Sequence, residues 1–198
     1  MMPKIVDHDA RREEVAEATW RVIARQGIEA TTVKEIAKET GFSTGIFAHY
    51  FKNKNDLLLY ALQLASIRIG ARMWKKGEEA SGGEVLGSVL LEALPLDRER
   101  RLEWQIWVTF WGQAASDTAL TEEQKHWYVE YRSLVRGLIL DGQRSGHFRT
   151  DIDAGEEADS MVAFVDGIGL QATLDPRRFP PEYQIKLLEQ RLSSLRGK

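Results

Sequence analysis

Residues 31–54 read TTVKEIAKETGFSTGIFAHYFKNK, and this stretch decides the fold. Thr32 and Glu35 stand three residues apart, which is the spacing of a capping box that opens a helix. Gly41 is suited to end that short helix in the left-handed conformation, and Ser43 is a favoured first residue for the next one. The sequence therefore predicts two short helices joined by a tight turn that contains glycine, the pattern of a helix-turn-helix.

Longer helices are predicted on both sides of this pair. The first runs from Ala10 to Gln26 and ends at Gly27, because inward-facing positions recur at the spacing of one helix face. These positions are Val15, Ala18, Thr19, Val22 and Ile23. Asn53 with Asp56 opens another helix, which continues to about Lys76. Periodicity alone does not separate a helix-turn-helix from an arbitrary pair of short helices in a bundle.

The remainder of the chain is also predicted to be helical. The sequence Ser81-Gly82-Gly83 is a flexible break, and no convincing strand follows it. Helices are expected from Glu84 to near Pro95, from Asp97 past Trp111, from 118–121 to Gln143, from Asp153 to Leu174, and from Pro181 to Leu195. We therefore expect an all-α fold, with a DNA-binding domain in residues 1–54 and a helical domain in residues 55–198.

Composition excludes several classes of protein. The chain has 198 residues, a net charge of −3 and no cysteine, so disulfides, thiolate chemistry and cysteine zinc sites are excluded. Residues 1–54 hold nine Lys or Arg and eight Asp or Glu, so any DNA contact must come from a local patch. Met1 to Asp9 contain no apolar signal-peptide region, and the apolar run Leu57 to Leu62 is far shorter than a membrane span. A cytoplasmic protein without membrane contact is expected.

The segment Thr31 to Lys54 resembles the tetracycline-repressor (TetR/AcrR) family of transcription regulators. The residues that carry the resemblance are Thr32, Gly41, Ser43, Gly45, the run His49-Tyr50-Phe51, and Lys54. It implies a DNA-binding domain whose second short helix enters the major groove. The expected DNA-binding residues are Thr32, Lys34, Ser43, Thr44, Gly45, Ala48, His49, Tyr50 and Lys54.

Physical chemistry gives these residues different expected roles. Ser43 and Thr44 stand at a helix N-terminus, which attracts phosphate, and Gly45 lets the backbone approach closely. Lys34 and Lys54 are each expected to neutralise a phosphate. Thr44 and His49 are polar enough to reach bases or phosphates, and the Tyr50 hydroxyl can bond a phosphate. By their helical spacing, Phe47 and Phe51 are expected in the core.

One position departs from the family pattern. Many members have Tyr where this chain has Ala48, and the neighbouring Ile46 is also apolar. We therefore expect few direct hydrogen bonds to the bases. Methyl contacts and DNA shape are expected to contribute more to sequence recognition.

The rest of the chain is similar to the subfamily of the choline-responsive repressor of betaine synthesis (BetI-type). The similar runs are Trp104 to Ala114, Tyr131 to Arg149, and Asp166 to Phe179. The resemblance implies a homodimer through the last two helices, a double-stranded DNA operator as partner, and a pocket for a small-molecule effector. It does not identify the effector, because this type of domain serves regulators with varied ligands.

Aromatic residues are the candidates for the effector site. Aromatic faces can hold an organic cation, although aromatics at helical spacing are more often ordinary core. The candidate ligand-binding residues are Trp104, Trp107, Phe110, Trp111, Tyr128, Tyr131 and Gln171. The helix from Asn53 to Lys76 touches both domains and is expected to transmit ligand binding to the DNA-binding end.

Motifs for enzymatic function are incomplete. The sequence Gly167-x-Gly169-x-x-Ala172 imitates a dinucleotide-binding fingerprint but has no preceding strand, so we expect its small residues to permit close helix packing, including across a dimer interface. Glu123-x-x-His126 is half of a di-iron motif without its second copy. No enzyme, cofactor or metal site is therefore expected. The alternatives are a helical ligand-binding or enzymatic bundle without DNA binding, and a DNA-binding protein without an effector.

Overall fold

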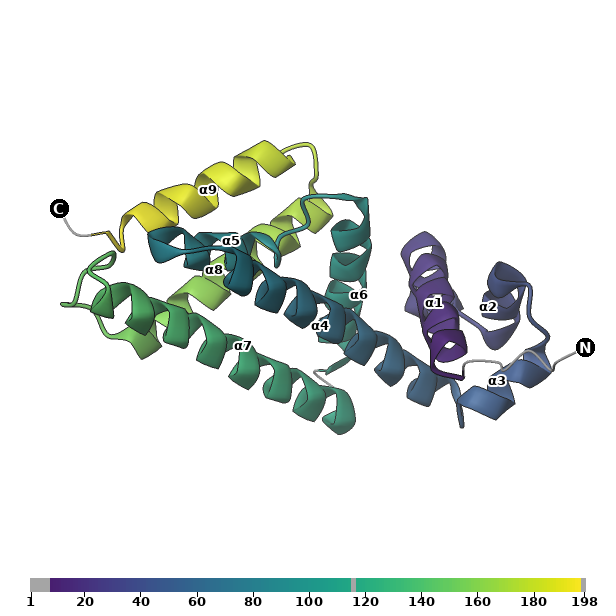
Figure 1. Ribbon diagram of the computed structural model, residues 1–198. Coiled ribbons are helices and arrows are strands. Elements are labelled where there is room, and N and C mark those ends of the chain that lie inside the picture. Colours follow the sequence, from purple (N-terminus) through teal and green to yellow (C-terminus); the bar gives the residue numbers. More distant parts are fainter. Residues whose placement is uncertain (1–7, 115–116, 197–198) are drawn as a thin grey trace, which may run out of the picture.

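A computed structural model describes residues 8–114 and 117–196, and every regular element in these ranges is helical (Figure 1). Residues 1–7 lie outside the described residues. They form most of the segment Met1 to Asp9, in which no signal peptide was predicted. The elements are α1 (His8–Ala30), α2 (Val33–Thr40), α3 (Thr44–Tyr50), α4 (Lys54–Glu79), the 3₁₀ turn η1 (Gly82–Glu84), α5 (Val85–Leu91), α6 (Arg98–Ala114), α7 (Thr118–Arg144), α8 (Ala154–Leu174) and α9 (Pro181–Ser193). The all-α prediction is confirmed.

Most of the predicted helix ends are confirmed by their capping bonds. The Thr32 hydroxyl accepts a hydrogen bond from the Glu35 N–H at 3.2 Å, and Gly41 adopts a left-handed φ of 73°. The Asn53 side chain accepts from the Asp56 N–H at 2.9 Å, which starts α4. Asp97 and Asp153 cap α6 and α8 in the same way. Polar residues at these positions therefore set the limits of the helices.

One local prediction was wrong in part. Only half of the capping box forms in the described chain, since the Glu35 carboxylate does not return a bond to Thr32. Gly27 has a non-helical φ of 78° and ψ of 165°, so the regular helix is interrupted there as predicted, and a further helical stretch of α1 follows this kink to Ala30. Ser43 is the N-cap residue of α3 as predicted, although its side chain makes no capping hydrogen bond.

The helices enclose three apolar clusters. One joins α1 to α2 and α3 around Ile36, Phe47 and Phe51. A second joins α1 to α4, α6 and α7 around Trp20 and Phe110. The third fills the C-terminal domain between α5, α7, α8 and α9. Because α1 contributes one face to each of the first two clusters, it joins the DNA-binding helices to the C-terminal domain.

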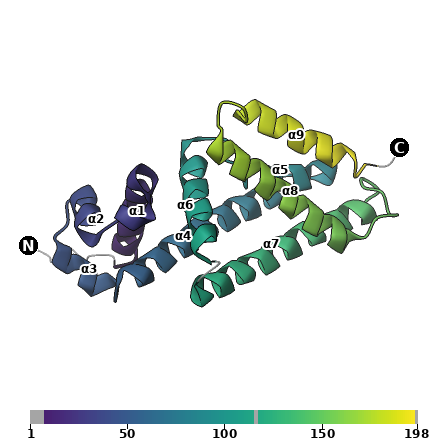
Figure 2. The same ribbon diagram turned by 180° about the vertical axis from the view of Figure 1, so that it is seen from behind.

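The arrangement in space follows from these contacts. α1, α2 and α3 lie at one end of the molecule, and α4 runs from them into the C-terminal domain (Figure 1). Seen from behind, α8 and α9 lie on the outside of that domain, away from α1 (Figure 2). No helix within residues 8–114 and 117–196 is long and apolar enough to cross a membrane.

Gly169 allows α8 to approach α6 closely. A Cβ atom at this position would come within 2.0 Å of the Trp104 indole ring. At Gly167 such an atom would meet nothing within 4 Å. The close packing predicted for these small residues therefore occurs within one chain at Gly169, where it makes space for Trp104.

We expect Gly169→Ala to lower the free energy of unfolding by roughly 1–3 kcal/mol, because Trp104 must shift to make room for the added methyl group. Gly137→Ala in α7 is the matched control, since a Cβ there meets no atom within 4 Å. The control should be neutral or stabilising by up to about 1 kcal/mol, because alanine favours helix. Urea unfolding measures both, and equal stabilities of the two variants would contradict the packing argument.

Candidate DNA interface and effector site

Helix α3 presents its polar residues to solvent. Of the nine predicted DNA-binding residues, Tyr50 and Lys54 are half-buried and the other seven are exposed. Phe47 and Phe51 point inward and are each 4% exposed, which confirms their predicted place in the core. The apolar side of α3 therefore faces α1 and α2, and its polar side is free for a partner.

The turn before α3 leaves groups free for an anion. The Ser43 hydroxyl caps nothing, and both Ser43 and Thr44 are exposed. Thr44 and Gly45 occupy the first turn of α3, where backbone N–H groups have no partner within the helix. This arrangement suits contact with a DNA phosphate.

An aromatic group connects α3 with the start of α1. The ring centroids of His49 and Tyr50 are 5.1 Å apart, and His8 lies 5.3 Å from His49 and 5.5 Å from Tyr50. His8 was not among the predicted interface residues, because it lies about 40 positions away in the sequence and no motif links it to α3. The structure adds it to the surface that carries the DNA-binding candidates.

Lys54 has a structural partner that the sequence did not predict. Its ammonium group donates a hydrogen bond to the Ile28 carbonyl at 3.0 Å, near the kinked end of α1. Lys34, in contrast, is exposed and makes no ion pair with another described residue. Lys34 is therefore the cleaner test of a phosphate contact, because replacing Lys54 would also remove a bond between α4 and α1.

An ion-pair cluster fixes α2 against α1. Glu39 accepts hydrogen bonds from Arg21 at 2.9 Å and from Arg25 at 3.0 Å. Both hydrogen bonds lower the pKa of the Glu39 carboxyl group, and the bond from Arg25 has the larger effect. The cluster holds α2 at a set angle to α1 and so helps to orient α3.

The predicted ligand-binding residues separate into two groups. Trp104 and Trp111 of α6 lie with their rings 5.6 Å apart, and Tyr128 and Tyr131 of α7 pack against the C-terminal cluster. Phe110 instead lies fully buried beside Trp20 in the core shared with α1. Gln171 is exposed on the outer side of α8. Trp107 packs against this same core, so Phe110 and Trp107 lie together there, whereas Gln171 is not brought to the aromatic residues.

Buried polar atoms without hydrogen-bond partners gather on α6 and α7. On these two helices they are the indole nitrogens of Trp107 and Trp111, both amide atoms of Gln124, and the Tyr131 hydroxyl, and the described chain has others on Arg12, Arg72 and Gln184. Such atoms are rare in folded proteins and each costs about 1–3 kcal/mol when it is left unpaired. Trp107 packs against the cluster around Trp20, whereas Tyr131 packs against the C-terminal cluster, so the unpaired atoms mark more than one place where a polar ligand or water would be accommodated.

Asp166 of α8 supplies a carboxylate to the same region. It accepts a hydrogen bond from the Tyr128 hydroxyl at 2.7 Å. Burial raises the pKa of Asp166 to about 6, and burial together with the Asp166 charge raises the pKa of Tyr131. Asp166 was not among the predicted site residues, although an acidic residue within the apolar face of a helix is a signal that could have found it.

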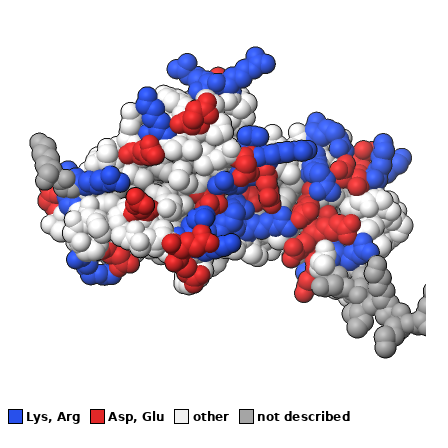
Figure 3. Space-filling model, turned by 45° about the horizontal axis from the view of Figure 1, so that its top comes forward, with Lys and Arg blue, Asp and Glu red and all other residues white. Residues whose placement is uncertain are grey.

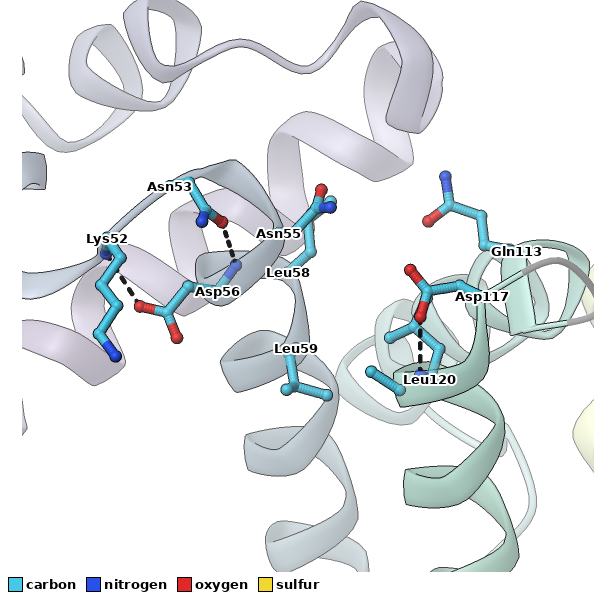
Figure 4. Close-up of a pocket in the computed structure, with 10 residues that line it drawn as sticks. Lys52, Asn53, Asn55, Asp56, Leu58, Leu59, Gln113, Asp117 and Leu120 are labelled. Carbon is cyan, nitrogen blue, oxygen red and sulfur yellow. Dashed lines mark hydrogen bonds between the residues drawn. The ribbon is translucent and has the colours of Figure 1, made fainter.

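A separate pocket lies between the two parts of the molecule. It has a volume of about 330 Å³ and is bordered by the first turns of α4 on one side and by the end of α6 and start of α7 on the other. Figure 4 shows Asp56 bonded to the Lys52 N–H and Asp117 bonded to the Leu120 N–H at its edges. None of the predicted ligand-binding residues lines this pocket.

Comparison with known proteins places this chain in a family. Residues 15–61 match the family described as "Bacterial regulatory proteins, tetR family". Residues 83–197 match the one described as "BetI-type transcriptional repressor, C-terminal". The chain belongs to the TetR family. Within it, the C-terminal domain is of the BetI type, as the sequence predicted.

Relatives and solved structures agree with this assignment. The regulator PksA of Bacillus subtilis is 32% identical over 98% of this chain and 94% of its own length. The regulator BetI of Vibrio atlanticus is 28% identical over 88% of this chain and 86% of its own length. A putative regulator from Saccharomonospora viridis, solved in complex with choline, is 26% identical with a TM-score of 0.88, and the match covers 96% of this chain and all of that one.

We expect Asp166→Asn to change the dependence of stability on pH. The contribution of Asp166 to the stability of the wild type should fall as pH rises from about 4 to about 6, because the unfolded chain loses the Asp166 proton at lower pH than the folded chain does. At pH 7 the asparagine variant should therefore be more stable by roughly 2–3 kcal/mol. The advantage should vanish below pH 4, and thermal unfolding over this range measures it. An advantage independent of pH would contradict the assignment.

Proposed function

We propose that this TetR-family protein is a ligand-responsive transcriptional repressor that binds a pseudo-palindromic operator as a dimer. Binding of a small molecule in the C-terminal domain would release it from DNA. The observation that carries the proposal is the combination of an exposed α3 with a group of unpaired polar atoms in the interior of the body. Repression, as opposed to activation, rests on the description of the matched family.

The proposed dimer forms through α8 and α9. Their outer faces carry small and apolar residues with no cover in the monomer, including Gly167, Leu174 at 71% exposure and Tyr183 at 38%. A two-fold dimer through these helices would place two copies of α3 on one side of the assembly, in successive major grooves.

The proposed effector is an organic cation that also carries a hydrogen-bond acceptor. Asp166, which the Tyr128 hydroxyl contacts, and the Trp111 ring suit a cation, whereas the unpaired indole N–H groups and the Tyr131 hydroxyl suit an acceptor. The Tyr128 ring already has the Arg132 guanidinium 4.9 Å from its centroid. The choline complex of the Saccharomonospora viridis relative supports an organic cation as the class of effector but does not identify the compound. On this proposal Trp104, Trp107, Trp111, Tyr128 and Tyr131 contribute to the site, and Gln171 and Phe110 do not.

Several further features belong to the proposal. The DNA-binding unit is residues 1–54 and the effector-binding unit is residues 55–198, and the protein acts in the cytoplasm without catalysing a reaction. The rival function, a ligand-binding or enzymatic bundle, has less support, since no group of three or more His, Asp or Glu residues in the described chain is arranged to hold a metal.

DNA binding is tested with a duplex that the wild type selects from a random pool. Lys34→Ala should weaken binding and reduce the slope of log affinity against log salt by about 1, because one phosphate contact is lost. Lys75→Ala, which makes the same change of charge on α4 far from α3, is the control and should leave both quantities unchanged. If the wild type selects no duplex at any salt concentration, the rival function replaces this one.

The effector class is tested by tryptophan fluorescence with choline and tetramethylammonium as probes. A saturable change in emission, lost in Asp166→Asn, would support a cation site between α6, α7 and α8. An equal response in wild type and Asp166→Asn would contradict the role of the carboxylate. A response to choline and none to tetramethylammonium would indicate that the acceptor contacts dominate.

A further inference from the structure

Arg132 of α7 lies beside the pair formed by Tyr128 and Asp166. Its guanidinium carbon is 4.9 Å from the centroid of the Tyr128 ring, a distance at which a cation and an aromatic face attract each other. The hydroxyl of the same tyrosine donates a hydrogen bond to Asp166 at 2.7 Å. The protein therefore already places a cation of its own on one of the aromatic residues that are proposed for the effector.

An exposed ion pair holds Arg132 in this position. Its Nε atom is 3.0 Å from the carboxylate of Asp159 on α8. Arg132 follows Tyr128 by one turn of α7, and Asp159 precedes Asp166 by two turns of α8, so the four residues form two neighbouring contacts between the helices. The side chains of Arg132 and Asp159 are 46% and 68% exposed, so water surrounds this ion pair and weakens it. A competing cation can therefore displace Arg132.

The charge of Arg132 also acts on Asp166. Burial raises the pKa of Asp166 to about 6, whereas the Tyr128 hydrogen bond and the Arg132 charge lower it. The Asp166 charge in turn raises the pKa of Tyr131. Within the described chain, no arginine or lysine forms an ion pair with Asp166. Arg132 is thus close enough to act on this carboxylate but leaves its direct contact position to a ligand.

The wider surface gives a cation no strong preference for this region. Figure 3 shows acidic and basic side chains interspersed along the middle of the molecule. Opposite charges so close together largely cancel at a distance, and salt screens exposed charges beyond about 10 Å. Binding of a cation therefore depends on the groups within contact distance, and Arg132 is one that carries the same charge as the ligand.

We propose that Arg132 occupies part of the effector site in the free protein and that an organic cation must displace it. This inference rests on the proposed function, because it concerns the same site between α6, α7 and α8. A guanidinium and a quaternary ammonium group are attracted to the same aromatic face, and two like charges at one ring repel each other. Arg132 therefore sets a threshold, so that the site responds only at effector concentrations high enough to overcome its contacts with Tyr128 and Asp159.

The test measures the dissociation constant of choline, used as a probe, by titration calorimetry. Arg132→Ala should bind choline roughly three- to thirtyfold more tightly than the wild type, because the competing contacts with Tyr128 and Asp159 are removed. Asp159→Asn should tighten binding by a smaller factor and should have no further effect in the Arg132→Ala protein. Arg136→Ala removes the same charge one turn further along α7, also at an exposed position, and is the matched control.

A second measurement needs no ligand. Because the Arg132 charge lowers the pKa of Asp166, removing it makes a charged Asp166 less favourable in the folded protein. At pH 7, Asp166→Asn should therefore raise the thermal midpoint of Arg132→Ala by more than it raises that of the wild type. In the Arg136→Ala protein the increase should equal that of the wild type. Equal increases in all three proteins would overturn the placement of Arg132 at the site.

The binding results separate this inference from the proposed function. If the wild type binds choline and Arg132→Ala binds it equally or more weakly, or if Arg136→Ala gains as much as Arg132→Ala, the inference is overturned and the effector class stands. If neither the wild type nor Arg132→Ala binds choline, the proposed effector class fails and the competition fails with it. Choline binding by Arg132→Ala that is much tighter than that of the wild type supports both.

Discussion

The structure depends on the burial of Trp20 between the two parts of the chain. Its indole N–H donates to the Ala61 carbonyl of α4 at 3.0 Å, and its ring contacts the cluster that includes Ile106 and Phe110 of α6. Burial of a large aromatic side chain contributes several kilocalories per mole to stability, and a buried indole requires such a partner for its N–H. α1 is thereby fixed to α4 and α6, and the orientation of α2 and α3 follows from that of α1.

The sequence predicted the helices well because their ends are marked by local chemistry. Thr32, Gly41, Asn53 and Asp153 act within a few residues of themselves, so no tertiary information is needed to interpret them. The errors occurred where distant residues intervene. The interruption of α1 at Gly27 was expected, but the helical stretch that follows it to Ala30 was not. Likewise only one inward face of α1 was predicted, whereas a second face with Ala16 and Trp20 packs on the C-terminal domain.

The candidate site was only partly accessible to sequence reasoning. Residues of α3 could be named because a contiguous motif places them, and Phe47 and Phe51 were assigned to the core by spacing. The aromatic residues of the C-terminal domain could be named as a class, but the sequence did not separate those that face a ligand from those in the core. The rotation of α6 about its axis decides whether Phe110 faces a ligand or α1. That rotation is fixed by the Arg72–Glu103 pair and by the contact of Trp104 with Gly169. Asp166 gained importance only once its burial was known.

The core shared by α1, α4 and α6 also limits how such a regulator can be recombined. Hybrid regulators are built by joining the DNA-reading end of one protein to the sensing end of another. A junction at residue 54 would separate Trp20 and Ile23 from Ile106 and Phe110, and would leave their apolar surfaces facing unmatched neighbours. A working chimera would need the contact residues of α1 transferred together with the C-terminal domain. Both sides of this interface, and not only a continuous segment of sequence, must therefore come from the same protein.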